Sequence, residues 1–379
     1  MISFIIYAEK DEEDRLRETL GSLDTEGSSG RAETIVIRDA ESEGQAFNKG
    51  LSLAKGDIIL TLSSGDVYTR TALSRIMEEA EKGASDLVIS GILKEMNFGK
   101  TEIRKPQSEL CSETDLFINA VFTDIYDKGL LSACGNKLYR KKILEDHGLS
   151  YREDMSEGAE LEFCLRYMTA SSAISLIGTP LIRKALRNDM ADPEACMAVI
   201  ASYNALFNGL DIDDDVINDM NGRIAGLCID SLKKFYRSTG AGETEKLCML
   251  TGISRHKEFR ELLKETGPWS AENGVLRFML LHNKEGLLHK ALLRLRQRDD
   301  IEVRRYRKDP EILHEDPKVQ PVITEAQPED TEPEKLSEEE SAVQEENISK
   351  EEALPQESEL SDSELDEIKD HLESGLMDL

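Results

Sequence analysis

The chain has 379 residues, of which 32% are charged and 5% aromatic, as expected for a soluble protein of two or three domains with a polar extension. Its formal net charge of −29 disfavours nucleic acid as a partner. Residues 309–379 carry 25 Asp and Glu against 4 Lys, which leaves a charge of only −8 for residues 1–308. The acidity is therefore concentrated in the C-terminal segment.

The cysteines and the apolar segments indicate the cellular compartment of the protein. The six cysteines lie 20 or more residues apart, so the sequence has no C-x-x-C pair that would indicate a zinc site or a redox dithiol. We expect reduced thiols, most of them buried. The N-terminus has no basic leader, and no window reaches the roughly 18 to 20 apolar residues of a membrane span. These features predict a cytoplasmic protein.

The first part of the chain alternates between apolar runs and helical patterns, with turn residues at each junction. Strands are expected at 3–8, 33–39, 57–62 and 85–90, and helices at 11–23, 43–56 and 69–83. This alternation is the signature of βαβ units and predicts a mainly parallel sheet flanked by helices. Such sheets bind ligands at the carboxyl ends of their strands, here the loops after Ala8, Ile37 and Leu62.

The pattern is less regular between residues 92 and 190 and becomes helical after that. Helices are expected at 113–121, 137–148 and 158–170, and strands at 173–178 and 180–186. Residues 191 to about 298 have helical periodicity and contain no strand pattern of comparable strength. We therefore predict an α/β domain over 1–190 and a helical domain over 191–308.

Residues 309–379 have the composition of a disordered tail. They contain no Phe, Trp or Tyr and six of the ten prolines, so they cannot bury enough apolar surface to offset chain entropy. Near the end, Leu360, Leu365, Ile368 and Leu372 recur at roughly helical intervals. A short helix that folds on a protein partner is thus the alternative to a fully solvated tail.

The run FNKGLSLAKGDIILTLSSGDVYTRTALSRIMEEAEKGASDLVI, residues 47–89, resembles the core of family 2 glycosyltransferases. In that family an Asn-(Lys/Arg)-Gly helix leads into a strand that ends in an Asp-x-Asp motif. Upstream, SFIIYAEKDEEDRLRETLGSL and ETIVIRDAES resemble the first two strands of the family, and downstream GNKLYRKKILEDHGL and EGAELEFCLRYM resemble its acceptor-side region. The resemblance covers residues 2–187 and implies a GT-A-like, Rossmann-like α/β fold.

The resemblance also implies a reaction, the inverting transfer of a sugar from a nucleotide-diphospho-sugar to a glycan or lipid-linked cell-envelope acceptor, as in polysaccharide biosynthesis. The diphosphate leaving group needs positive charge, which the family supplies with a divalent cation held by carboxylates at a strand end. A separate carboxylate acts as general base on the acceptor hydroxyl.

Three residues map to the nucleotide-sugar side of the family. Asp39 lies at the end of the second strand, where it would contact the nucleotide, and the alternative is that it caps the following helix. Asn48 and Lys49 fall on the Asn-Lys-Gly segment, where a cation suits a diphosphate. A solvated helix face is the alternative reading of Lys49.

The Asp-x-Asp motif maps to Ser63-x-Gly65, with Asp66 directly after it. Ser63 and Gly65 replace the carboxylates that would usually hold Mg²⁺ or Mn²⁺. The resemblance assigns Asp66 to the remaining metal or diphosphate contact and Ser63 to the donor site. The alternative is that Asp66 only begins the turn into the next helix.

The Glu-Asp pair of the family falls on Ala159-Glu160, so the resemblance assigns Glu160 as the general base. Glu157, three residues earlier, is expected on the same helix face. The alternative for both is a solvated acidic first turn, favoured by the helix dipole. The family's opening Pro-x-Tyr-Asn is replaced by Tyr7 to Lys10, so the nucleotide is not predicted.

A basic, leucine-rich segment at 277–308 carries 10 Lys and Arg against 4 acidic residues. Its leucines are expected to pack on the helical domain, and two alternatives stay open. The segment could lie as an amphipathic helix on an anionic membrane, giving a peripheral protein at the inner face, or it could dock the acidic tail.

The sequence favours two functions over a third, a structural adaptor dominated by the helical half and the tail. The first is a glycosyltransferase with Asp39, Asn48, Lys49 and Ser63 at the nucleotide-sugar, Asp66 at the metal or diphosphate, and Glu160 as the base. The second is an inactive pseudo-glycosyltransferase that serves as a binding or scaffold module.

Overall fold

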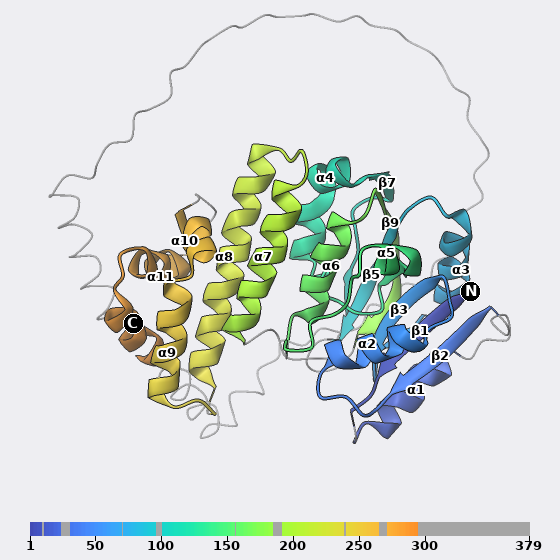
Figure 1. The fold of residues 1–379 in the computed structure, drawn as a ribbon, viewed down its shortest axis with the longest axis horizontal. Helices are drawn as coiled ribbons and strands as arrows, with labels where there is room; N and C mark the ends of the chain where they lie inside the picture. The colour runs from blue at the N-terminus through green and yellow to red at the C-terminus, as the bar shows by residue number, and fades with distance from the viewer. Residues whose placement is uncertain are drawn as a thin grey trace, which may run out of the picture. The chain divides into compact units, whose positions relative to one another are not determined.

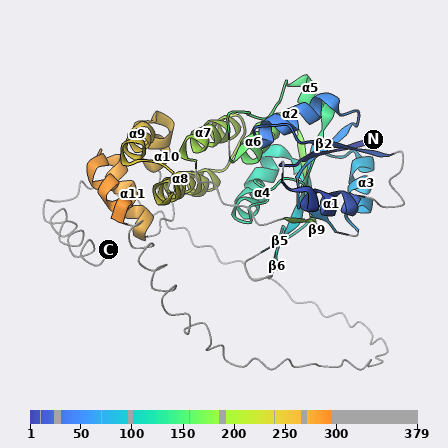
Figure 2. The same ribbon diagram turned by 90° about the horizontal axis from the view of Figure 1, so that it is seen from below.

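A nine-stranded mixed sheet flanked by helices is formed by the first half of the chain (Figures 1 and 2). The computed structural model describes residues 1–9, 11–23, 31–69, 71–95, 101–155, 157–184, 192–238, 240–264 and 271–294. The strand order is β2-β1-β3-β8-β5-β9-β4, with β6 paired to β5 and β7 paired to β9. The strands are β1 (Ile2–Tyr7), β2 (Ala32–Ile37), β3 (Ile58–Ser63), β4 (Val67–Tyr68), β5 (Leu87–Glu95), β6 (Thr101–Arg104), β7 (Leu110–Glu113), β8 (Lys137–Arg140) and β9 (Ala173–Lys184).

Helices alternate with the first strands and then make up the described part of the chain after residue 192. They are α1 (Glu13–Leu23), α2 (Glu43–Leu53), α3 (Ala72–Lys82), α4 (Thr114–Asp127), α5 (Lys141–Asp146), α6 (Ala159–Thr169), α7 (Pro193–Asn208), α8 (Asp214–Arg237), α9 (Glu243–Ser254), α10 (Lys257–Lys264) and α11 (Ala271–Leu281). Residues 285–294 are also helical.

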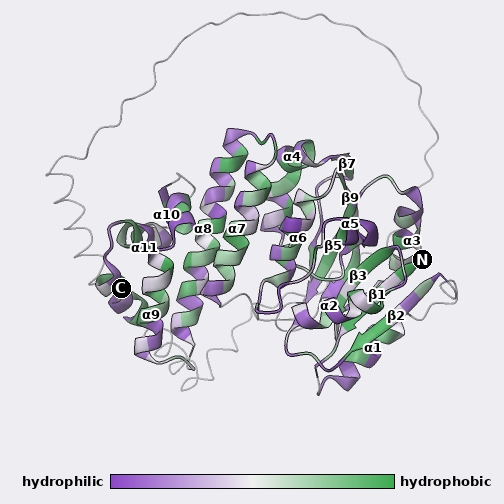
Figure 3. Ribbon diagram, in the orientation of Figure 1, coloured by the Kyte–Doolittle hydropathy of each residue, from purple (hydrophilic) through white to green (hydrophobic). Residues whose placement is uncertain are grey.

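The parallel core of the sheet agrees with the sequence prediction. β1 pairs in parallel with β2 and with β3, and the register sets Tyr7 opposite both Ile37 and Ser63. All residues of β1 and β3 are buried, and both strands are predominantly hydrophobic (Figure 3). Because the three strands end at the same edge, the loops that follow them meet there.

Several predicted elements differ from the structure. Residues 137–140, expected within a helix, form β8, which is antiparallel to both β3 and β5. Residues 173–184, expected to lie in two strands, form the single strand β9. The short strands β4, β6 and β7 had no sequence signal of their own. β6 pairs with the neighbouring strand β5, whereas β4, β7, β8 and β9 pair with strands distant in sequence, which local propensity cannot reveal.

The helical half packs directly on the sheet half. Ser202 on α7 donates a hydrogen bond to Glu162 Oε1 on α6 at 3.0 Å, and Asn119 on α4 bonds Asp211 and Asp213 before α8. The boundary predicted near 190 falls among residues 185–191, which lie outside the described part. Residues 295–379 also lie outside it, so the disordered tail stays a prediction.

The described part of the basic segment buries its apolar face. Leu280, Leu288 and Leu292 are each at most 2% exposed and belong to the main hydrophobic core, whereas Leu287 is 56% exposed. This burial favours core packing among the three alternatives for the segment. None of the described helices is long and apolar enough to cross a bilayer.

Gly50 sets the distance between α2 and β1, and we expect its replacement by alanine to lower the free energy of unfolding by about 1–3 kcal/mol. A Cβ at this position would lie 2.1 Å from Ile5 Cγ2. That clash outweighs the gain in helix propensity, about 1 kcal/mol. The change is measured by urea denaturation.

The matched control for this prediction is Gly21→Ala on α1, where an added Cβ meets nothing within 4 Å. The control should be neutral or stabilising, because only the propensity gain applies. Equal stability of the two variants would show that α2 does not depend on this close approach.

Candidate active site

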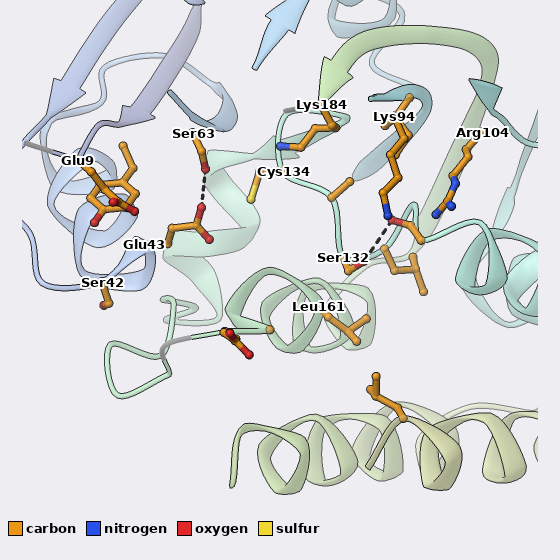
Figure 4. A pocket seen from close by; sticks show the side chains of 18 of the residues that line it. Glu9, Ser42, Glu43, Ser63, Lys94, Arg104, Ser132, Cys134, Leu161 and Lys184 are labelled. Atoms are coloured by element: carbon orange, nitrogen blue, oxygen red, sulfur yellow. Dashed lines mark hydrogen bonds between the residues drawn. The ribbon is translucent and has the colours of Figure 1, made fainter. Parts of the chain in front are cut away.

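A cavity of about 830 Å³ opens at the edge where β1 and β3 end. Its lining comes from the ends of β1 and β3, the starts of α1 and α2, the far ends of β5, β6 and β9, residues 129–134, the start of α6, and α8. Figure 4 shows Glu9, Ser42, Glu43 and Ser63 on one side and Lys94, Arg104 and Lys184 on the other. The cavity thus has an acidic side and a basic side.

The turn after β3 is built around Asp66, which is completely buried. Asp66 Oδ2 accepts a hydrogen bond from the backbone N–H of Ser63 at 3.1 Å and forms an ion pair with the Lys184 ammonium. Gly65 has φ +89°, a conformation that favours glycine. The Asp66 carboxylate thus holds the turn, as one of the two predictions expected. The cation that it contacts in this structure is the Lys184 ammonium.

The two serines of the turn hydrogen-bond to carboxylates from other elements. Ser63 Oγ donates to Glu43 Oε1 on α2, and Ser64 Oγ donates to Glu12 Oε2 ahead of α1. Ser63, which was predicted to contact the nucleotide-sugar, lines the cavity. Glu12 and Glu43, which were not predicted, line it as well. Ser42 is the N-cap of α2, because its Oγ accepts a hydrogen bond from the Gln45 N–H.

The donor set of this turn does not fit a divalent cation held in the manner of an Asp-x-Asp motif. Mg²⁺ and Mn²⁺ prefer several oxygen ligands, with carboxylates among them. Of the four residues Ser63 to Asp66 only Asp66 has a carboxylate, and Lys184 occupies one of its oxygens. Within the described ranges, no three His, Cys, Asp or Glu side chains are grouped so as to hold a metal ion.

Glu160 lies in a buried polar network at the start of α6 and does not line the cavity. Its Oε1 accepts hydrogen bonds from Lys137 Nζ at 3.0 Å and Tyr139 OH at 2.9 Å, and its Oε2 accepts one from Tyr151 OH at 2.8 Å. The residue is 4% exposed. Burial, and then the Glu160 carboxylate, raises the pKa of both phenols, so Tyr139 and Tyr151 remain protonated donors.

Glu157 lies outside α6, which begins at Ala159 after Gly158 in a left-handed conformation. The expectation that Glu157 and Glu160 share a helix face is therefore wrong, because the chain turns between them. Glu157 is half-buried, lines the cavity, and accepts a hydrogen bond from the Asp192 N–H at 3.2 Å. The two glutamates thus face different surroundings.

Of the four residues predicted to bind the nucleotide-sugar, Asp39, Asn48 and Lys49 are not part of the described cavity lining, whereas Ser63 is. Asn48 fastens α2 to a later loop, since Nδ2 donates to the Tyr151 carbonyl and Oδ1 accepts from the Tyr151 N–H. Lys49 donates to the carbonyl oxygen of Asp39. The Asp39 residue is exposed. These contacts hold the loop after β2 and the loop before α6 around α2.

Cys134 also lines the cavity, and its chemistry is limited by its surroundings. Burial raises the pKa of the Cys134 thiol well above its usual range, and the Glu160 and Glu43 carboxylates raise it further. The thiol is therefore neutral at neutral pH, which makes it a poor nucleophile.

Comparison with known proteins identifies the domain that carries this cavity. Residues 5–148 match the sequence model described as Glycosyl transferase family 2. Residues 5–148 therefore form a glycosyl transferase family 2 domain. This family 2 domain includes β1, β3 and the turn with Asp66, whereas Glu157, Glu160 and Lys184 lie beyond the matched residues. No curated protein sequence matches the chain significantly.

Solved structures support the same fold for the family 2 domain and the helices after it. Crystal structures of S. aureus TarS 1-349 in complex with UDP and with UDP-GlcNAc are both 13% identical to this chain, with TM-scores of 0.52 and 0.53. Each similarity covers 78% of this chain. It covers 91% of the TarS chain in the UDP complex and 92% of the TarS chain in the UDP-GlcNAc complex. The predicted GT-A-like α/β fold is thereby confirmed.

Proposed function

We propose that the chain transfers a sugar from a nucleotide-diphospho-sugar to a hydroxyl group of a glycan or cell-envelope acceptor, with inversion. The observation that carries this proposal is the cavity at the carboxyl ends of β1 and β3 in a family 2 domain. Its volume, about 830 Å³, lies within the range of small-molecule sites. The TarS complexes hold UDP and UDP-GlcNAc, so uridine nucleotides are the first donors to test.

The chemistry of inversion assigns tasks to the cavity. The acceptor oxygen attacks the anomeric carbon as the bond from that carbon to the diphosphate breaks, and the nucleoside diphosphate leaves. A carboxylate on the acceptor side takes the hydroxyl proton. The basic side of the cavity is suited to the donor diphosphate, because cationic groups stabilise its charge.

We assign the base role to Glu157. A general base must reach the reacting hydroxyl directly or through one water, and Glu157 lines the cavity. Glu160, the base predicted from the resemblance, is buried and already accepts hydrogen bonds on both carboxylate oxygens. Its role is to fix the buried strand β8 and the loop with Tyr151 against α6.

The residues predicted to contact the nucleotide also fall into two groups, those that line the cavity and those that do not. Ser63 keeps its donor role because it lines the cavity. Asn48 and Lys49 support the site indirectly through the loops they hold, and Asp39 presents its backbone carbonyl to Lys49. Glu41, Ser42 and Glu43, at the start of α2, line the cavity, whereas these three residues are not part of its described lining.

Titration calorimetry of the full-length protein with UDP-, GDP-, CDP- and dTDP-sugars tests the proposal. We expect one nucleotide class to bind, and we expect release of the nucleoside diphosphate when that donor is incubated with acceptor or, more slowly, with water. Absence of binding by all four classes, with and without Mn²⁺, would overturn it.

A second candidate function is a binding module without catalysis. The observation that favours it is the loss of two carboxylates from the turn at Ser63 and Gly65. In that case a nucleotide-sugar binds but nucleoside diphosphate is never released, so the same titration followed by a release assay separates the two functions.

A further inference from the structure

We infer that the Lys184 ammonium, held by Asp66, supplies the positive charge for the donor diphosphate, so that donor binding needs no divalent cation. This inference rests on the proposed nucleotide-sugar site and adds to it how the diphosphate is recognised. It follows from the misfit between the turn after β3 and a metal ion, together with the cations that the sheet places beside that turn.

The position of Lys184 is fixed by strand pairing. β4 and β9 are antiparallel, with Val67 opposite Arg183 and Tyr68 opposite Ile182. One further step along the same register sets Lys184 opposite Asp66, where the ion pair forms. The ammonium therefore lies beside the first residue after the Ser63-x-Gly65 segment, where a metal ion on an Asp-x-Asp motif would be expected.

The ion pair is buried on one side and open to the cavity on the other. The Asp66 side chain is 0% exposed and that of Lys184 is 12% exposed. A buried carboxylate must be paired with a cation, and this pairing holds the Lys184 side chain in place. Figure 4 shows the Lys184 side chain reaching into the cavity toward Ser63 and Cys134.

Two more cations lie next to Lys184 on the same face of the sheet. Lys94 on β5 is directly opposite Lys184 in the parallel β5–β9 register. Arg104 on β6 is opposite Ile92, two residues before Lys94, so its side chain shares that face. All three line the cavity. Among the described residues Lys94 has no hydrogen-bond or ion-pair partner, so its ammonium can bind an anion.

This row of cations suits a diphosphate. A divalent cation and an ammonium row perform the same task, which is to neutralise charge that increases on the leaving group as the sugar departs. The competing arrangement is a metal held by Glu12 and Glu43, which lie at the two serines of the turn. Metal dependence of nucleotide binding distinguishes the two.

The experiment is a calorimetric titration of the full-length wild-type protein with UDP in EDTA, in Mg²⁺ and in Mn²⁺. We expect the same Kd within about twofold in all three buffers. Binding of UDP only with Mg²⁺ or Mn²⁺ would overturn the inference and leave the proposed function intact. If no nucleotide binds in any buffer, the proposed function and this inference both fail.

Variants of β9 test the residue itself. Lys184→Met should weaken UDP binding in EDTA about 10- to 100-fold, the effect of losing a charge-assisted hydrogen bond, and should leave uridine binding unchanged. The matched control is Arg183→Met, whose side chain lies on the other face and pairs with Glu18 and Glu95. Unchanged UDP affinity in Lys184→Met would overturn the assignment.

Loss of the buried pair could unfold Lys184→Met, so two further variants keep the inference open to refutation. Lys184→Arg retains the charge and should bind UDP in EDTA within a few-fold of wild type, since guanidinium groups bind phosphate well. Lys94→Met leaves Asp66 paired and should weaken UDP binding but not uridine binding. Equal loss of UDP and uridine affinity in Lys94→Met would argue against a diphosphate site on this face.

Discussion

Replacing Glu157 by glutamine should lower kcat by about 100- to 10,000-fold, the usual contribution of a general base. Glutamine has nearly the same shape but cannot accept the acceptor proton. Because Glu157 is assigned to the acceptor side, the affinity for the nucleotide-sugar should stay within about twofold of wild type. The measurement combines the rate of nucleoside diphosphate release with a calorimetric titration of the donor.

The control for this prediction is Asp154→Asn, which makes the same chemical change three residues earlier. Asp154 is exposed, pairs with Arg152, and does not belong to the cavity lining. It should retain wild-type turnover. Full activity of Glu157→Gln would remove it from the base role, and a folded Glu160→Gln variant that had lost turnover would return that role to Glu160.

Replacing Glu160 by alanine should lower the free energy of unfolding by about 3–5 kcal/mol, the cost of removing one partner from a buried ion pair. The Lys137 side chain is 0% exposed and would keep a buried charge without its carboxylate. The Tyr139 and Tyr151 hydroxyls would lose their acceptor as well. Urea denaturation of the purified variant measures the change.

An exposed ion pair provides the comparison for Glu160. Lys142 and Asp146 form a pair on α5 with side chains 81% and 52% exposed. Asp146→Ala should cost less than about 1 kcal/mol, because water and ions replace such a partner at little cost. If Glu160→Ala unfolded at the same urea concentration as Asp146→Ala, the buried network could not be what holds β8 against α6.

The sequence allowed part of the site to be located. Ser63 and Asp66 were expected at the end of a buried strand, and both lie there, because an apolar run followed by polar turn residues specifies a strand end locally. The different surroundings of Glu157, which lines the cavity, and Glu160, which is buried, could not be predicted. They depend on β8, whose residues Lys137 and Tyr139 bury Glu160, and β8 itself was expected to be helical.

The cation beside Asp66 also had no sequence signal. Lys184 is 118 residues away and reaches Asp66 only through the pairing of β4, a two-residue strand, with β9. Lys94 and Arg104 join it through the registers of β5 with β9 and with β6. A shift of one residue in any of these registers would move the side chains to the opposite face.

Local sequence patterns were enough to specify the parallel βαβ core and the edge of the sheet at which the cavity opens. Strand and helix periodicity are properties of neighbouring residues, and the strands that they define end together in β1, β2 and β3. Which charges face the cavity depends instead on the packed chain. Burial and strand register arise from contacts between distant segments, and here they set Lys184 against Asp66 and separated Glu157 from Glu160.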